Sequence, residues 1–137
     1  MSLTRLFLLA TGLLSVAFGV AYLVAPIPMA ALADLDPPTP LAVIEVRGFY
    51  GGQLVGLGGF ILLGVWRSAF VTPALLLIVA SLGGTALGRV VGVFASGSLP
   101  AIIVGALVLE LLATALALLL LNRERDSAGR SAAAPVR

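Results

Sequence analysis

The stretch EVRGFYGGQLVGLGGFILLG, residues 45–64, determines how the rest of the chain is interpreted. It combines two opposite charges, Glu45 and Arg47, with a tyrosine, a glutamine and many glycines in an otherwise apolar run. Helices in lipid associate through close backbone contact and interhelical hydrogen bonds. We therefore interpret the stretch as part of a membrane-buried helix whose small and polar residues face other helices.

The composition of the whole chain agrees with a membrane protein. Of its 137 residues, 61% are hydrophobic and 10% are charged, whereas soluble domains are about 45–50% apolar and about 25% charged. The chain lacks cysteine, histidine and lysine, which excludes disulfides, metal sites of the Cys/His type and Schiff-base chemistry. We expect no catalytic residues, no metal and no cofactor, and the short arginine-containing tail does not indicate a nucleic-acid partner.

Four apolar runs are each long enough to cross a bilayer, which requires about 20 residues. They predict an all-α, polytopic membrane protein with a four-transmembrane-helix bundle. We expect one domain over residues 1–122 and a flexible cytoplasmic tail over residues 123–137. The predicted helices cover residues 3–25, 41–66, 70–95 and 99–121.

The segments between the runs contain helix-breaking residues. Residues 26–40 hold five prolines and two aspartates, which predicts a loop with at most a short turn lying in the interface. An alternative for the first run is a signal peptide cleaved before Asp34. The run is longer than a typical signal sequence, and two prolines precede that site, so we expect a retained helix.

Arginines concentrate at one end of the predicted helices. Arg5, Arg67 and the tail arginines fall on one side of the membrane, and Asp34 and Asp36 fall on the other. Because Lys and Arg are enriched in cytoplasmic segments, we expect both termini to be cytoplasmic. A multi-pass protein of the plasma membrane follows from this pattern, and membrane lipids are its first expected partner.

Glycines recur at helical spacing in the second and third runs. Because residues four apart lie on one face of a helix, each series predicts a smooth surface that another helix can approach. We expect these glycines to pack helices and not to contact a ligand. They are Gly48, Gly52, Gly56 and Gly59 in the second run, and Gly84, Gly88 and Gly92 in the third.

Four ionisable residues lie inside the apolar runs, namely Glu45, Arg47, Arg89 and Glu110. Each costs roughly 2.5–3.5 kcal/mol on insertion scales, so the chain must compensate for them. Helix rise places Glu110 near the bilayer midplane and the other three in the outer half. With Tyr50, they form our candidate ligand-binding site, and a static ionic lock between the helices is the alternative.

Opposite charges on different helices suggest specific pairs. Glu45 and Arg47 are two residues apart and point in different directions, so they cannot pair well with each other. Arg89 is the expected partner of Glu45, and Arg89 also has Glu110 within reach. We expect Arg47 to snorkel to the surface or to meet Glu110.

On these residues, the chain resembles a bacterial family of small four-helix membrane proteins, domain-of-unknown-function family 4345, which is similar in layout to DoxX-like proteins. The resemblance covers nearly the whole chain and rests on EVRGFYGG (residues 45–52), on Gly84 to Arg89 and on Glu110. It implies a four-helix bundle in the bacterial inner membrane and the position of the charged site. It implies no reaction, although DoxX-like relatives include subunits of quinone-linked oxidoreductases.

Three functions remain open from the sequence. The first is the binding of a lipid-like or small ligand in the charged site. The second is a role as an accessory subunit of a larger membrane complex, for example a quinone-linked one, or as a homo-oligomer packed through the glycines. The third and weakest is an enzyme acting on a lipid or quinone, which would have to work with carboxylates, a tyrosine and arginines alone.

Overall fold

The computed structural model describes the backbone of residues 2–132 and the side chains of residues 2–126. This part of the chain is helical and contains no strand. Four stretches are long and apolar enough to cross a membrane: Leu3–Val24, Pro40–Trp66, Ser68–Ser96 and Ala101–Asp126. The predicted class, an all-α protein with four membrane-spanning helices, is confirmed.

The chain divides into two compact units, Met1–Val71 and Thr72–Arg137. The first unit contains the helices α1 and α4 and the shorter elements near them. The second contains most of α5 (Val71–Ser96) and all of α6 (Ala101–Ala132). The elements of the first unit are α1 (Leu3–Val24), α2 (Pro26–Ala31), α3 (Pro40–Val46), the π-helical turn η1 (Arg47–Gly52), α4 (Gln53–Trp66) and the 3₁₀ turn η2 (Ser68–Phe70).

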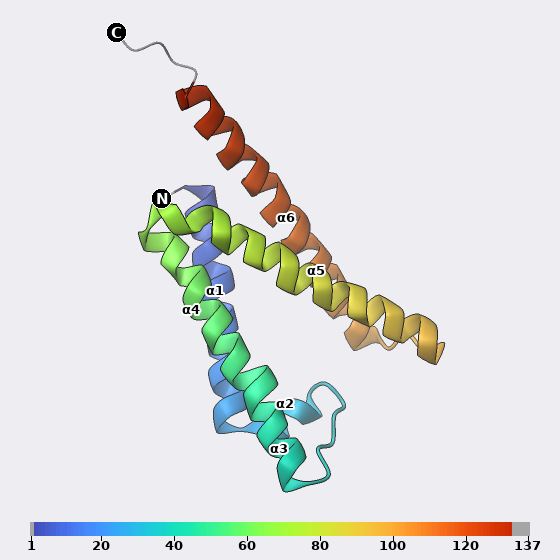
Figure 1. Cartoon of the computed structure of the whole chain (residues 1–137). Helices are drawn as coiled ribbons and strands as arrows, with labels where there is room; N and C mark the ends of the chain where they lie inside the picture. The colour runs from blue at the N-terminus through green and yellow to red at the C-terminus, as the bar shows by residue number, and fades with distance from the viewer. Residues whose placement is uncertain (1, 133–137) are drawn as a thin grey trace. The chain divides into compact units, whose positions relative to one another are not determined.

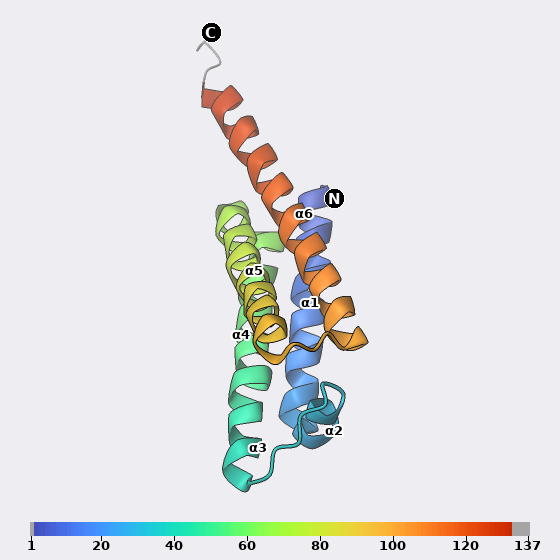
Figure 2. The same cartoon turned by 90° about the vertical axis from the view of Figure 1, so that its right-hand side faces the viewer.

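In the first unit, α1 and α4 run antiparallel and side by side (Figures 1 and 2). Their backbones meet at glycines, because a Cβ atom on Gly58 would lie 2.8 Å from the carbonyl oxygen of Gly12. Further along, a Cβ atom on Gly19 would lie 2.8 Å from the carbonyl oxygen of Gly51. The hairpin therefore depends on positions without side chains, as expected for helices that associate in lipid.

The second membrane-spanning stretch is not one regular α-helix. Between α3 and α4, residues Arg47–Gly52 form a π-helical turn, in which hydrogen bonds run from i to i+5. The turn lies within the glycine-rich stretch of residues 45–64. It changes the angular spacing of residues along the helix, so a face extrapolated from Glu45 at α-helical spacing does not continue unchanged into α4.

Polar side chains cap the first turns of two helices in the first unit. Ser2 caps α1 by accepting a hydrogen bond from the Arg5 amide at 3.3 Å. Thr39 caps α3 through the Ala42 amide at 3.2 Å, with Pro40 in the first turn, where proline is well tolerated. The predicted loop at residues 26–40 contains the six-residue helix α2, and Asp34 adopts φ 56° in the turn that follows it.

The second unit is a helical hairpin of α5 (Val71–Ser96, which begins one residue before the unit) and α6 (Ala101–Ala132). Figure 1 shows the short connection between them at the end of the unit where both helices meet. Gly97 in this connection adopts φ 65°, a left-handed conformation that suits glycine. The carbonyl oxygen of Pro100 accepts hydrogen bonds from the Ile103 and Val104 amides at 2.9 and 3.2 Å, so α6 begins directly after the proline.

The last helix extends beyond its predicted end at residue 121 and continues to Ala132. The prediction took the change from apolar to polar residues as the end of the helix. That change marks where the chain leaves an apolar environment, whereas residues 122–132 contain no proline and many good helix formers. Residues 133–137 of the predicted tail lie outside the described part.

Candidate ligand-binding site at the turn between α5 and α6

Arg47 contacts the end of α1. Its Nε donates a hydrogen bond to the carbonyl oxygen of Leu23 at 3.1 Å. Leu23 lies in the last turn of α1, where carbonyl groups lack an intrahelical partner and carry the negative end of the helix dipole. Arg47 therefore acts first as a cap for α1, a role that the sequence analysis did not identify.

Tyr50 packs against α1 at the same place. Its ring stacks on Tyr22 with centroids 5.3 Å apart and an interplanar angle of 28°. Gly51, the next residue, would place a Cβ atom 2.8 Å from the Leu23 side chain. The π-helical turn is thus attached to the end of α1 by a hydrogen bond, a ring stack and a close backbone approach.

Glu45 is exposed on α3. Within the described part of the first unit, its carboxylate makes no hydrogen bond or ion pair, since Arg47 turns toward α1. Its pairing with Arg89, which belongs to the second unit, stays a prediction.

Arg89 and Glu110 come together within the second unit. Arg89 Nη1 donates to Glu110 Oε1, with side chains 33% and 13% exposed respectively. The spacing accounts for their meeting: Arg89 lies seven residues before the end of α5 and Glu110 nine residues after the start of α6, so both lie about 10–14 Å from the hairpin turn. This contact is one of the two that the sequence analysis considered for Arg89.

Thr114 extends this polar group along α6. It follows Glu110 by four residues and faces Gly83 of α5, where a Cβ atom would lie 3.5 Å from the Thr114 methyl group. In the described part of the chain, Glu110 Oε2 and Thr114 Oγ1 are buried and make no hydrogen bond. Unpaired buried oxygens are costly, so these two atoms lower the stability that the contact of Glu110 with Arg89 gives to the hairpin.

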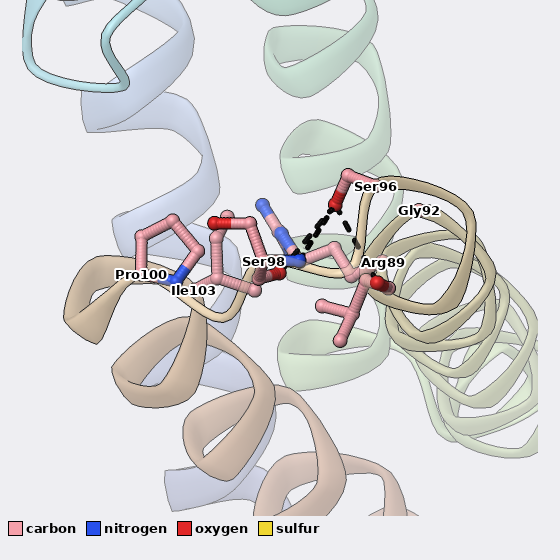
Figure 3. A pocket seen from close by; sticks show the side chains of 7 residues that line it. Arg89, Gly92, Ser96, Ser98, Pro100 and Ile103 are labelled. Atoms are coloured by element: carbon pink, nitrogen blue, oxygen red, sulfur yellow. Dashed lines mark hydrogen bonds between the residues drawn. The ribbon is translucent and has the colours of Figure 1, made fainter.

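A pocket of about 310 Å³ lies beside Arg89 at the hairpin turn (Figure 3). Figure 3 shows the Arg89 side chain extending from α5 toward Ser98 and Ile103. Residues 89, 93 and 96 follow each other at helical spacing, so one face of α5 forms the wall on that side. The lining residues are Arg89, Gly92, Val93, Ser96, Ser98, Pro100 and Ile103.

The serines of the turn bond mainly to one another and to the backbone. Ser96 Oγ accepts from the Ser98 amide at 3.3 Å and lies within donating distance of the Val93 and Ser98 carbonyl oxygens, at 3.4 and 3.5 Å. These bonds shape the rim of the pocket. Ser96 lies seven residues after Arg89, two helical turns away, and this spacing is the signal in the sequence that the two residues share one face of α5.

The predicted packing glycines behave differently from Gly12, Gly19, Gly51 and Gly58. A Cβ atom on Gly48, Gly56 or Gly59 would have no neighbour within 4 Å, and one on Gly52 would meet only the carbonyl oxygen of Arg47 in the same helical stretch, at 3.9 Å. The contact with α1 instead uses Gly51 and Gly58, which the sequence analysis missed. Their seven-residue spacing matches that of Gly12 and Gly19 on α1 and was the available signal.

The glycines that were predicted to pack α5 also lack neighbours at their Cβ positions. Cβ atoms on Gly84, Gly88 and Gly92 would have no neighbour within 4 Å, whereas Gly83 faces α6. Packing of another helix against either predicted series stays a prediction.

The chemistry available to this site is that of a guanidinium, a carboxylate and hydroxyl groups. Among the described residues, no three His, Cys, Asp or Glu side chains lie together as they would around a metal ion. The site can donate hydrogen bonds from Arg89 to an acceptor in the pocket, and Val93 and Ile103 can contact an apolar group.

Comparison with known proteins identifies a family but no activity. The family model with the description "Domain of unknown function (DUF4345)" matches residues 3–121, which include all four membrane-spanning stretches except the end of α6. Neither the curated proteins nor the solved structures gave a match. The likeness to DoxX-like proteins stays a prediction, and the chain belongs to the DUF4345 family.

Proposed function

We propose that this protein is a multi-pass membrane protein that binds a lipid-like ligand in the pocket at the turn between α5 and α6. One observation carries the proposal: Arg89, which lies in a membrane-spanning helix, lines a pocket that also has apolar walls. Ionisable residues within membrane helices are costly and commonly mark functional sites. The match to a family of unknown function supplies no competing activity.

The lining of the pocket suits an amphiphile. Arg89 and Ser98 provide polar groups, and Val93, Pro100 and Ile103 provide apolar surface. A volume of about 310 Å³ lies at the lower end of ligand pockets, which span about 300–1,000 Å³. The pocket therefore fits a polar group and the first part of a chain, with the rest of the chain lying along the helices in the bilayer.

The position of the pocket along the helices supports the same ligand. Arg89 begins about 10 Å from the end of α5, and its side chain extends toward the turn (Figure 3). Long cationic side chains reach from the hydrocarbon region to the polar interface in this way. This geometry supports a position of the polar groups near the level of lipid head groups.

Native mass spectrometry of the detergent-purified protein tests the proposal. Gly92 lines the pocket and has no neighbour within 4 Å of its Cβ position, so the side chain of Gly92→Phe can begin there without a clash at Cβ, and we expect it to occupy the pocket. We expect a co-purifying or added lipid on the wild type, at least about tenfold less on Gly92→Phe, and the wild-type amount on the control Gly105→Phe, which changes an open position on α6. Equal lipid on all three proteins would refute the pocket.

The proposed orientation places both termini in the cytoplasm of a bacterial cell, with the protein in the inner membrane. In the first unit, Arg5 and Arg67 lie at the end of the hairpin away from Asp34 and Asp36. In the second, Arg123 and Arg125 lie on the part of α6 that is away from the hairpin turn. The positive-inside rule then assigns the arginine end of each unit to the cytoplasm.

A role in a homo-oligomer or a larger complex is the second candidate. The observation that favours it is the open glycine series on η1 and α4, since Cβ atoms on Gly48, Gly56 and Gly59 would have no neighbour within 4 Å in the first unit. Bulky side chains on such a face would block the approach of another helix. We expect Gly56→Ile to lower the oligomer mass seen by light scattering, with Leu57→Ile as the control, and a monomeric wild type would contradict this role.

A further inference from the structure

We infer that the polar group of the bound amphiphile is an anion, a phosphate or a carboxylate, recognised by the free N–H groups of Arg89. This inference rests on the proposed function and names the ligand class of the same pocket. It depends on three features of the second unit: the charge of the lining, the hydrogen-bonding capacity of the lining, and the contact between Arg89 and Glu110.

The charge of the lining is positive. Arg89 is the one charged residue among those that line the pocket, and Glu110 contacts it without belonging to the lining. The helix ends do not decide the sign, because the C-terminal end of α5 and the N-terminal end of α6 meet at the turn and their partial charges oppose each other. A ligand in the pocket therefore meets the guanidinium as its main electrostatic feature.

The hydrogen-bonding capacity of the lining is that of a donor site. A guanidinium has five N–H groups, and the contact of Nη1 with Glu110 uses only part of this capacity. Ser96 Oγ already accepts from the Ser98 amide and lies beside two carbonyl oxygens. The groups left for a ligand are N–H donors of Arg89 and the hydroxyl of Ser98, which match the oxygens of a phosphate or carboxylate.

Glu110 acts as a positioning residue for this donor group. Its Oε1 accepts from Nη1 of the guanidinium from the side of α6, and the remaining N–H groups of the planar arginine fork can bind a second oxyanion. A lysine ammonium is a point charge without this fork. The inference therefore predicts that lysine cannot fully replace Arg89.

The test measures lipid preference by native mass spectrometry of the intact protein. The probes are phosphatidylglycerol, phosphatidic acid and diacylglycerol with identical acyl chains, together with inorganic phosphate. We expect the two anionic lipids to bind at least about tenfold more tightly than diacylglycerol. Inorganic phosphate alone should compete poorly, because it cannot contact Val93 and Ile103.

Three variants separate the effect of the charge of Arg89 from the effect of its planar fork. Arg89→Gln should abolish the preference for anionic lipid over diacylglycerol, while diacylglycerol still binds. Arg89→Lys retains the charge for a membrane helix and should keep only part of the preference. The control Arg67→Gln changes an arginine of the first unit that does not line the pocket, and it should keep the full preference.

The possible failures are distinguishable. Equal binding of diacylglycerol and anionic lipids, with both lost in Gly92→Phe, would overturn the anion inference and leave the proposed function standing. Lipid binding that Gly92→Phe does not reduce would overturn both. Inorganic phosphate that binds as tightly as phosphatidylglycerol would support recognition of the anion and overturn the lipid-like ligand.

Discussion

Gly12 and Gly58 approach each other so closely that a methyl group on Gly58 would clash with the backbone of Gly12. A Cβ atom on Gly58 would lie 2.8 Å from the Gly12 carbonyl oxygen, and one on Gly12 would lie 3.2 Å from the Gly58 carbonyl oxygen. The contact is between backbones, so it cannot be relieved by rotating a side chain. It sets the distance between α1 and α4 in the first unit.

Substitutions at these two glycines should therefore lower the free energy of unfolding by different amounts. Gly58→Ala clashes with the backbone of Gly12 and Val16 and should lower the free energy of unfolding by about 2 kcal/mol, as overpacking commonly does. Gly12→Ala meets mostly the flexible end of Leu62 and should cost less. Unfolding by sodium dodecyl sulfate in mixed micelles, followed by circular dichroism, provides the measurement.

Gly56→Ala is the matched control for this series, because it lies on the same helix and has no neighbour at its Cβ position. We expect its free energy of unfolding to stay within about 0.5 kcal/mol of the wild type or to rise slightly, since alanine favours helix over glycine. A loss equal to that of Gly58→Ala would show that the close approach of Gly12 and Gly58 does not limit the packing.

Removing the Arg47 cap should loosen the end of α1. Arg47→Gln loses the hydrogen bond from Nε to the Leu23 carbonyl oxygen and the favourable charge near the helix C-terminus, together worth about 0.5–1 kcal/mol. Faster amide hydrogen exchange at Leu23–Ala25 is the specific readout. Arg67→Gln, which changes an arginine at the opposite end of the hairpin, should leave this exchange unchanged, and an equal acceleration in both variants would contradict the capping role.

The chain has only two tyrosines, Tyr22 and Tyr50, and their rings stack on each other. Tyr50→Leu should lower the free energy of unfolding by about 1 kcal/mol beyond the effect of lost area, the value typical of an aromatic pair. Tyr50→Phe keeps the ring and should retain that stability. If the two variants lose equal stability, the hydroxyl of Tyr50 matters and the ring stack does not.

Arg89 and Glu110 should behave as a coupled pair. Arg89→Leu or Glu110→Leu leaves one charge unpaired among the membrane helices and should cost about 2–3 kcal/mol. The double variant removes both charges and should be more stable than either single one, since breaking an ion pair is worse than replacing it. Additive losses in the double-mutant cycle would show that the two side chains do not interact.

The orientation of the chain can be tested with single cysteines, because the native sequence contains none. We expect Ser98→Cys, at the turn between α5 and α6, to react with a membrane-impermeant maleimide in intact cells. Asn122→Cys, near the opposite end of α6, should react only after the cells are opened. The reverse pattern would refute the orientation derived from the positive-inside rule.

The candidate site was predictable only in part. Arg89 and Glu110 could be selected because charges within apolar runs are rare and costly, and their similar distance from the hairpin turn follows from helix rise. The pairing of Arg89 with Glu45 stays a prediction. The pocket beside Arg89 also needed the structure, because it forms where the first turn of α6 meets one face of α5.

The sequence by itself determined the helical class, the number of membrane-spanning stretches and, approximately, their limits. Hydrophobicity summed over about 20 residues is a strong signal, because every backbone polar group in a bilayer must be satisfied within the helix. Only the tertiary structure decided which glycines pack α1 against α4. The π-helical turn at Arg47–Gly52 interrupts regular α-helical spacing between Glu45 and α4, so the face extrapolated from Glu45 differs from the one that contacts α1, where Gly51 and Gly58 lie.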